Sequence, residues 1–188
     1  MKKTDDFKLA VATFTDFMQL PDGTPLVSPE MLQILARKGF FHAPASTKYH
    51  GNYPGGLFAH SFAVAKSLVT FTDNNNLHWE KPRSPYIVGM FHDLCKIDQY
   101  RLLSHSQDPD VRYDYNPDTL LKGHGDKSVM LLSQFYTLTE EEIMCIRYHM
   151  GAYTEKEEWP YYGRAVEQYP NVLWTHTADM LATKVAGV

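Results

Sequence analysis

Nine histidines are present in the chain, and several of them are separated by long intervals and accompanied by aspartates. The side chains best suited to hold metal are His60, His92, Asp93, His124, His149 and Asp179. Imidazole and carboxylate ligands without thiolates suit manganese, iron, nickel, cobalt or zinc, and six ligands are more than one tetrahedral zinc ion needs. We therefore expect a cofactor of two divalent transition-metal ions. His50 and His176 stay outside this set but are candidates to line the pocket.

Helical periodicity places these side chains on the faces that should point to the core. His60 shares a face with Val64, and Asp179 shares one with Val172. A single histidine in such a position is more often a core residue satisfied by a hydrogen bond. Several helices that each direct an ionisable group inward favour a shared metal centre, because buried ionisable groups are costly unless paired or metal-bound.

The elements that position these residues are expected to be helices of one all-α domain spanning 1–188, with its core motifs in 55–184. Apolar spacing predicts helices over 5–19, 29–38, from 57 onward, and over 84–96, 124–136, 139–150 and 171–186. The Pro- and Gly-rich segments 41–56 and 151–170 are expected to be loops. The polar, Tyr-rich segment 98–118 is expected to form a small β-hairpin or an irregular excursion.

Composition limits the class of protein. The formal net charge is −4, which disfavours binding of nucleic acid by bulk electrostatics but is compatible with a local basic pocket. The N-terminal segment lacks the apolar core of a signal peptide, and no segment is long and apolar enough to span a membrane. Cys95 and Cys145 are too few for a disulfide framework. We expect a cytoplasmic protein without membrane partners and leave its oligomeric state open.

The segment GMFHDLCK, which contains His92 and Asp93, resembles the motif of the HD superfamily of metal-dependent phosphohydrolases. Four further segments resemble the remaining ligand regions of that family in the same order: GGLFAHS, KGHGDKSV, RYHMG and THTADMLATK. The stretch APASTKYHGNYPGGLFAHS is also similar to a small single-domain HD group of bacteria and phages, and to the HD part of a bacterial exonuclease.

This resemblance implies a helical bundle around a dinuclear site. In the family pattern the first metal would be bound by His60, His92, Asp93 and Asp179, and Asp93 would bridge to a second metal held by His124 and His149. The sequence departs from the subgroup with two adjacent histidines at the fifth position, because Tyr148 precedes His149. That departure weakens an assignment to the cyclic-dinucleotide enzymes and leaves the second metal with fewer ligands.

The implied activity is metal-dependent hydrolysis of a phosphate ester by a metal-activated hydroxide. The expected partner is a small phosphate ester or nucleotide, with a short single-stranded nucleic acid as a further candidate. Asp93 and Lys96 are the expected catalytic residues, and Lys96 and Lys127 are the expected substrate-binding residues. Lys96 follows His92 by four residues, which on one helix would place its ammonium near the rim of the site. For both lysines the alternative is a solvated surface residue.

Two other functions remain open at the level of sequence. The same six-ligand pattern resembles the HD-type di-iron oxygenases, which cleave carbon bonds with oxygen. Lys96 and the lack of another oxygenase signature favour hydrolysis. The third possibility is a non-catalytic binding module stapled by metal, although a structural site needs only four ligands.

Overall fold

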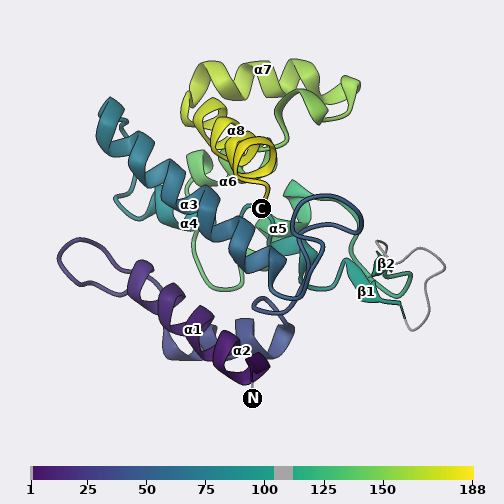
Figure 1. Ribbon diagram of the computed structural model, residues 1–188. Coiled ribbons are helices and arrows are strands. Elements are labelled where there is room, and N and C mark those ends of the chain that lie inside the picture. Colours follow the sequence, from purple (N-terminus) through teal and green to yellow (C-terminus); the bar gives the residue numbers. More distant parts are fainter. Residues whose placement is uncertain (1, 104–111) are drawn as a thin grey trace.

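The computed structural model describes residues 2–103 and 112–188, and helices dominate this part of the chain (Figure 1). Its α-helices are α1 (Lys2–Phe17), α2 (Pro29–Lys38), α3 (Gly56–Asn75), α4 (Ser84–Phe91), α5 (Gly125–Leu132), α6 (Glu140–Arg147), α7 (Trp159–Gln168) and α8 (Asn171–Leu181). Short 3-10 helices are η1 (Leu94–Ile97), η2 (Gly151–Tyr153) and η3 (Lys156–Glu158), and a π-helical segment, η4 (Ala182–Ala186), follows α8. The predicted all-α class is confirmed. No helix in the described ranges has the length and apolar character needed to cross a membrane.

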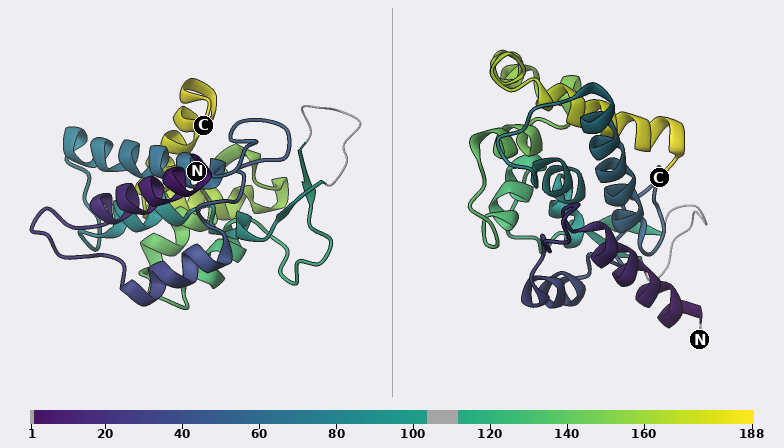
Figure 2. Two further views of the ribbon diagram at one scale, coloured as in Figure 1. Left: turned by 60° about the horizontal axis from the view of Figure 1, so that its bottom comes forward. Right: turned by 90° about the vertical axis from the view of Figure 1, so that its left-hand side faces the viewer.

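The helices α3 and α4 form the centre of the molecule. They pack against each other, α3 also packs against α8, and α6 packs against α5 and α8. From the other side α1 closes the core, where the ring of Phe14 makes edge contacts with Phe58 of α3 and Phe91 of α4. Figure 2 shows α1 and α2 on one side of the α3–α4 pair, with α7 and α8 on the other. Buried apolar side chains thus hold the central pair between two outer pairs.

Local signals account for where α2 and α3 begin and end. The hydroxyl of Ser28 accepts a hydrogen bond from the backbone amide of Met31 at 3.1 Å and caps α2. Gly39 ends the same helix with φ of 92°, a left-handed conformation that glycine adopts without steric cost. The chain then follows the predicted loop and enters α3 at Gly56. The predicted helix over 29–38 and the predicted loop that leads from it to the next helix are confirmed.

The segment 98–118 contains the predicted hairpin. Strands β1 (Tyr100–Leu102) and β2 (Tyr113–Tyr115) pair antiparallel, with Tyr100 opposite Tyr115. The two strands project to one side of the helices (Figures 1 and 2). The part of the predicted excursion that covers 104–111 lies outside the described residues.

The prediction of a loop over 151–170 is wrong, because this segment contains η2, η3 and the whole of α7. Pro160 is tolerated there since it occupies the first turn, where backbone amides have no intrahelical acceptor. The helical signal in this segment is obscured by its Pro and Gly content. Tyr162, Ala165, Val166 and Tyr169 recur at helical spacing and are the side chains that pack against the core.

The predicted helix over 84–96 is interrupted. Helix α4 ends at Phe91, a turn covers His92 and Asp93, and η1 begins at Leu94. The helices predicted over 124–136 and 139–150 are likewise shorter, since α5 begins after His124 and α6 ends before His149. Four of the six anchors therefore lie at helix ends, which corrects the expectation that each occupies a helical face.

Candidate metal centre

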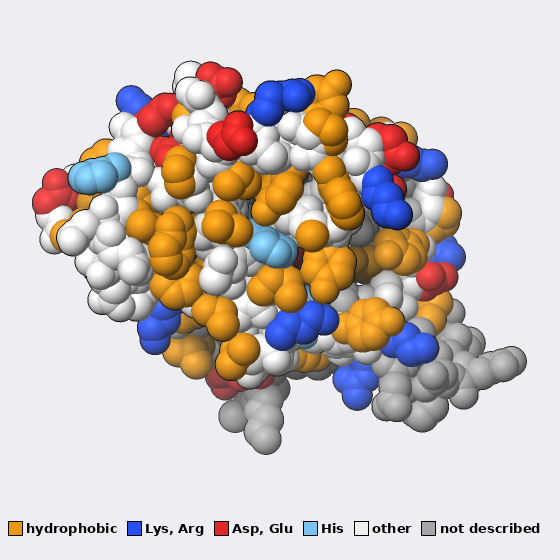
Figure 3. Space-filling model, turned by 90° about the horizontal axis from the view of Figure 1, so that it is seen from above, with side chains coloured by type: hydrophobic (Ala, Val, Ile, Leu, Met, Phe, Trp, Pro, Cys, Tyr) orange, Lys and Arg blue, Asp and Glu red, His pale blue; other side chains and the backbone are white. Residues whose placement is uncertain are grey.

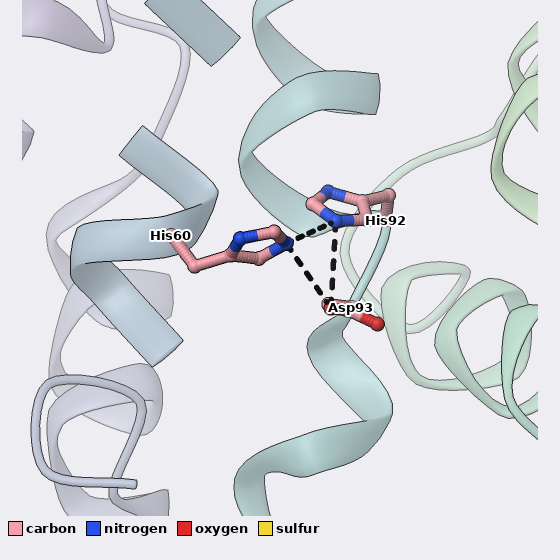
Figure 4. Close-up of side chains that lie close together, drawn as sticks. All are labelled: His60, His92 and Asp93. Atoms are coloured by element: carbon pink, nitrogen blue, oxygen red, sulfur yellow. Dashed lines mark hydrogen bonds and ion pairs between the residues drawn. The ribbon is translucent and has the colours of Figure 1, made fainter. Parts of the chain in front are cut away.

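The six side chains predicted to bind metal come together in one cluster. His60 lies in α3 and Asp179 in α8, whereas His92 and Asp93 follow α4, His124 precedes α5 and His149 follows α6. Three overlapping groups have ligand atoms within 4.8 Å of one another: His60, His92 and Asp93; His92, His149 and Asp179; and Asp93, Cys95 and His124. Figure 4 shows the first group, in which both imidazoles approach the carboxylate. The fold thus holds a buried cluster with the composition of a metal site.

Asp93 lies between two pairs of histidines. Its Oδ2 atom is 3.4 Å from Nε2 of His60 and 3.5 Å from Nε2 of His92. Its Oδ1 atom is 2.8 Å from Nε2 of His124 and 3.6 Å from Nε2 of His149. The two oxygens therefore face different histidines, as the oxygens of a carboxylate that bridges two cations would.

Asp179 completes the half of the cluster that contains His60. Its Oδ1 atom is 3.2 Å from Nε2 of His60 and accepts a hydrogen bond from the Thr183 hydroxyl at 3.3 Å. Ligand atoms of His92 and His149 also lie within 4.8 Å of this carboxylate. The two halves are therefore contiguous, and Asp179 stands where they meet.

Three of the four histidines turn their Nδ1 atom away from the cluster. It lies 3.0 Å from the carbonyl oxygen of Val188 for His60, 2.8 Å from that of Gly89 for His92, and 2.7 Å from that of Ile146 for His149. A carbonyl oxygen can only accept, so each Nδ1 donates, and when such a ring is neutral it presents the lone pair of Nε2 to the cluster. Metal-binding histidines are commonly fixed in this way by an acceptor behind the ring.

Two of these acceptors belong to helix ends. Gly89 lies in the last turn of α4 and Ile146 in the last turn of α6, where backbone carbonyls have no intrahelical donor. His92 and His149 each follow such a turn and donate back to the carbonyl three residues earlier. In each case one hydrogen bond satisfies a carbonyl at a helix end and orients the ring of a candidate metal ligand.

A cation would satisfy buried atoms that make no hydrogen bond within the part of the chain that the structure describes. Among the described residues, Asp93 Oδ1 and His149 Nε2 are buried and make no hydrogen bond, and the approach of His124 to Asp93 lacks hydrogen-bond geometry. The Nε2 atoms of His60 and His92 are 3.1 Å apart, so two lone pairs would repel there unless a proton or a cation lies between them. Because unpaired buried polar atoms are costly, this donor set fits divalent transition-metal ions.

The two carboxylates of the cluster favour positive charge beside them. Burial opposes ionisation of Asp93, but the charges of Lys96 and His124 hold the pKa of this carboxyl well below its usual range. Burial also opposes a charge on His60, yet its hydrogen bonds to Asp179 and Asp93 raise the pKa of this imidazole to about 9. Carboxylates that stabilise a proton on a buried imidazole also stabilise a cation among the same atoms.

Two glycines let the elements that carry the cluster's histidines approach closely. A Cβ on Gly89 of α4 would overlap the backbone of Ala65 in α3, and a Cβ on Gly125 of α5 would overlap the backbone of Arg147 in α6. The first contact brings the segment before His92 against the helix that carries His60. The second brings the residue after His124 against the end of the helix that precedes His149. The spacing of both histidine pairs therefore depends on a residue without a side chain.

Lys96 lies inside the cluster rather than at its rim. Its ammonium is 2.6 Å from Asp93 Oδ2, and the residue is 7% exposed. Burial disfavours the charge, but Asp93 outweighs it and raises the pKa of Lys96. Lys96 does not share a helical face with His92, because α4 ends before both residues. Lys96 lies in η1 and pairs with Asp93 instead. Its contact with substrate stays a prediction.

Lys127 connects the site to the hairpin. Its ammonium forms an ion pair with Asp98, which precedes β1, and is 2.8 Å from the Thr119 hydroxyl, which follows β2. The residue is 1% exposed, which differs from the solvated lysine of the alternative interpretation. Its predicted contact with substrate stays a prediction, whereas its contacts tie the base of the hairpin to the first turn of α5.

Three residues outside the predicted ligand set border the cluster. The ring of His50 lies 5.2 Å from that of His60, centroid to centroid, and Nδ1 of His176 lies 2.8 Å from the carbonyl oxygen of His149. Cys95 brings its Sγ atom to 3.4 Å from Nδ1 of His124. The sequence signal for Cys95 is weak, because an isolated buried cysteine resembles any small core residue.

Comparison of the chain with protein-family models gives no match, and neither the curated proteins nor the solved structures provide a significant one. The candidate function is therefore argued from the arrangement of the chain's own residues.

Proposed function

We propose that this chain is a metal-dependent phosphohydrolase of the HD type, and that it acts on a nucleotide or another small phosphate ester. The observation that carries the proposal is the position of Asp93, whose two oxygens face separate histidine pairs while Lys96 places an ammonium beside them. The order of the five motifs, which resembles the HD superfamily, supports the same assignment.

The ligands divide between two ions. His60, His92 and Asp179 would hold the first, His124 and His149 the second, and Asp93 would be shared by both. Two such ions lower the pKa of a water molecule and neutralise charge on phosphoryl oxygens. The protein keeps each imidazole in the ligating tautomer through the carbonyls behind the rings, so little reorganisation is needed when ions bind.

Lys96 supplies a positive charge beside the ions. In the protein alone its ammonium neutralises Asp93, a function that bound cations would take over. The ammonium would then be available to a phosphoryl oxygen, where lysine acts as a point charge and its interaction strengthens as negative charge develops. A catalytic role for Lys96 thus requires its ammonium to leave Asp93 and to contact the substrate instead.

A small substrate agrees with the surface around α7 and α8. On the face seen in Figure 3, lysines and arginines alternate with acidic and hydrophobic side chains instead of forming a continuous basic track. Extended nucleic acid is bound by clustered positive charge. A mononucleotide or short oligonucleotide needs only the local charge of the metal centre and Lys96.

The test is metal analysis of the purified protein, followed by a hydrolysis screen. Nucleoside monophosphates, phosphodiesters and short oligonucleotides would be offered with added manganese, iron, nickel or cobalt. Release of inorganic phosphate or of a shortened product, lost on chelation and restored by metal, supports the proposal. Metal-loaded protein that hydrolyses none of these esters would contradict it.

A di-iron oxygenase is the second candidate, favoured by the nitrogen and oxygen donor set, which suits iron. The two functions give opposite results in one experiment. Protein loaded anaerobically with ferrous iron and then exposed to oxygen, with a panel of small organic compounds as probes, would consume oxygen over repeated turnovers if it is an oxygenase. A phosphohydrolase would cleave its ester equally well with and without oxygen.

A further inference from the structure

His124 differs from the other three histidines in what holds its ring. Behind His60, His92 and His149 lies a backbone carbonyl, whereas Nδ1 of His124 faces the thiol of Cys95 at 3.4 Å. Cys95 is 0% exposed, and its backbone amide donates to the Ser128 hydroxyl at 3.0 Å. The thiol is therefore fixed against α5, the helix that begins directly after His124.

The thiol lies beside Nδ1 of the imidazole, and its Sγ atom is also within 4.8 Å of candidate ligand atoms of Asp93 and His124. It contacts Nδ1, while Nε2 of the same ring is the atom that lies 2.8 Å from Asp93 Oδ1. Two further atoms of this half of the cluster, Asp93 Oδ1 and His149 Nε2, are buried and make no hydrogen bond within the described part of the chain. The atoms left for a second ion are thus Nε2 of His124, Nε2 of His149 and this carboxylate oxygen.

We infer that Cys95 is a positioning residue for the second ion, because its thiol holds His124 with Nε2 directed toward that ion. The inference rests on the proposed dinuclear centre. A thiol is a weak donor and acceptor compared with a carbonyl oxygen. His124 is therefore held less firmly than the other three histidines, and it is also the most exposed of them, with 28% of its side chain accessible. The second ion is the one whose binding depends on this contact.

The test compares Cys95→Ala with Cys145→Ala, which removes the other fully buried thiol. Each protein would be titrated with cobalt(II), and bound metal would be counted per chain after removal of excess. We expect Cys95→Ala to keep the first ion and to bind the second about tenfold more weakly, since loss of a group that orients a ligand typically costs this much. Cys145→Ala should bind both ions as the wild type does.

A second variant and an absorption spectrum distinguish a positioning role for Cys95 from a ligating one. Cys95→Ser keeps a hydrogen-bonding group, so it should fall between wild type and Cys95→Ala, and it remains informative where the alanine variant fails to fold. Cobalt(II)-loaded wild type should show no thiolate-to-cobalt absorption in the near ultraviolet. Such a band, absent from Cys95→Ser, would make Cys95 a ligand and overturn the inference.

The inference about Cys95 would also be overturned if Cys95→Ser and Cys95→Ala bound each of the two ions as tightly as the wild type does. The proposed function would stand in that case. Failure of wild-type protein to bind any cobalt would instead contradict the proposed metal centre and, with it, the role given to Cys95.

Discussion

At the scale of single residues, Asp93 is the side chain on which the account depends most. It is 2% exposed and lies within 3.6 Å of four histidine nitrogens. We predict that Asp93→Ala loses both metal binding and hydrolytic activity, because it removes the carboxylate shared by the two halves. Metal per chain and turnover are the measurements, with circular dichroism to confirm the fold. An active variant with normal metal content would show that Asp93 is not a ligand.

Lys96 should affect turnover without emptying the site. We predict that Lys96→Ala lowers hydrolysis by about tenfold or more, roughly 1.4 kcal/mol of transition-state stabilisation. Metal content should be unchanged or higher, because the ammonium and the cations compete for Asp93. The matched control is Lys66→Ala, which removes an exposed lysine of α3. If Lys96→Ala hydrolysed every ester that the wild type accepts at the wild-type rate, Lys96 would serve only to neutralise the charge of Asp93.

The six candidate ligands could be named from residue type, helical periodicity and the resemblance of their motifs, and the structure places all six within one cluster. The hydrogen-bonding partners of the histidine rings could not be predicted from the sequence. The carbonyls behind His92 and His149 belong to helix ends whose positions the periodicity does not resolve. The position of Lys96 could not be predicted for the same reason, since its distance from His92 depends on whether the helix continues through residue 96.

At the scale of elements, close helix contacts set the spacing of the candidate ligands. Gly125→Ala would force the start of α5 away from the backbone of Arg147, and overpacking of this kind costs about 1–3 kcal/mol. We predict lower thermal stability together with weaker binding of the second ion, because His124 adjoins the displaced residue.

The control for this prediction is Gly163→Ala in α7, where an added Cβ has no neighbour within 4 Å. Alanine in such a helical position is expected to be neutral or stabilising by up to about 1 kcal/mol. Equal stability and metal affinity for the two variants would mean that the α5–α6 contact does not position the site.

Element boundaries are the least predictable feature of the fold. Ser28 and Gly39 mark α2 correctly because each acts through its own local hydrogen bonds and backbone angle. Helix α7 escapes prediction because its Pro and Gly content outweighs a short apolar face that becomes decisive only when packed on the core. The break after Phe91 has no local signal, since it depends on the contacts of His92 and Asp93 within the cluster.

At the scale of the whole molecule, the cluster joins elements from distant parts of the chain. Candidate ligands from α3, α8 and the ends of α4, α5 and α6 meet at one point, so bound ions would cross-link most of the fold. We predict that chelation lowers the melting temperature by on the order of 5–10 °C relative to protein saturated with metal. Differential scanning calorimetry with and without a chelator measures this, and unchanged melting would show that the ions do not bind the native state.

The most direct test of the central claim is the number of metal ions per chain in wild-type protein and in His149→Ala, measured by mass spectrometry of the native protein. The account predicts about two ions in the wild type, because six ligands exceed the needs of one. It predicts about one ion in His149→Ala, since this residue serves the second ion while the first keeps His60, His92, Asp93 and Asp179. A single ion in both proteins, or equal loss of both ions in the variant, would contradict the dinuclear assignment.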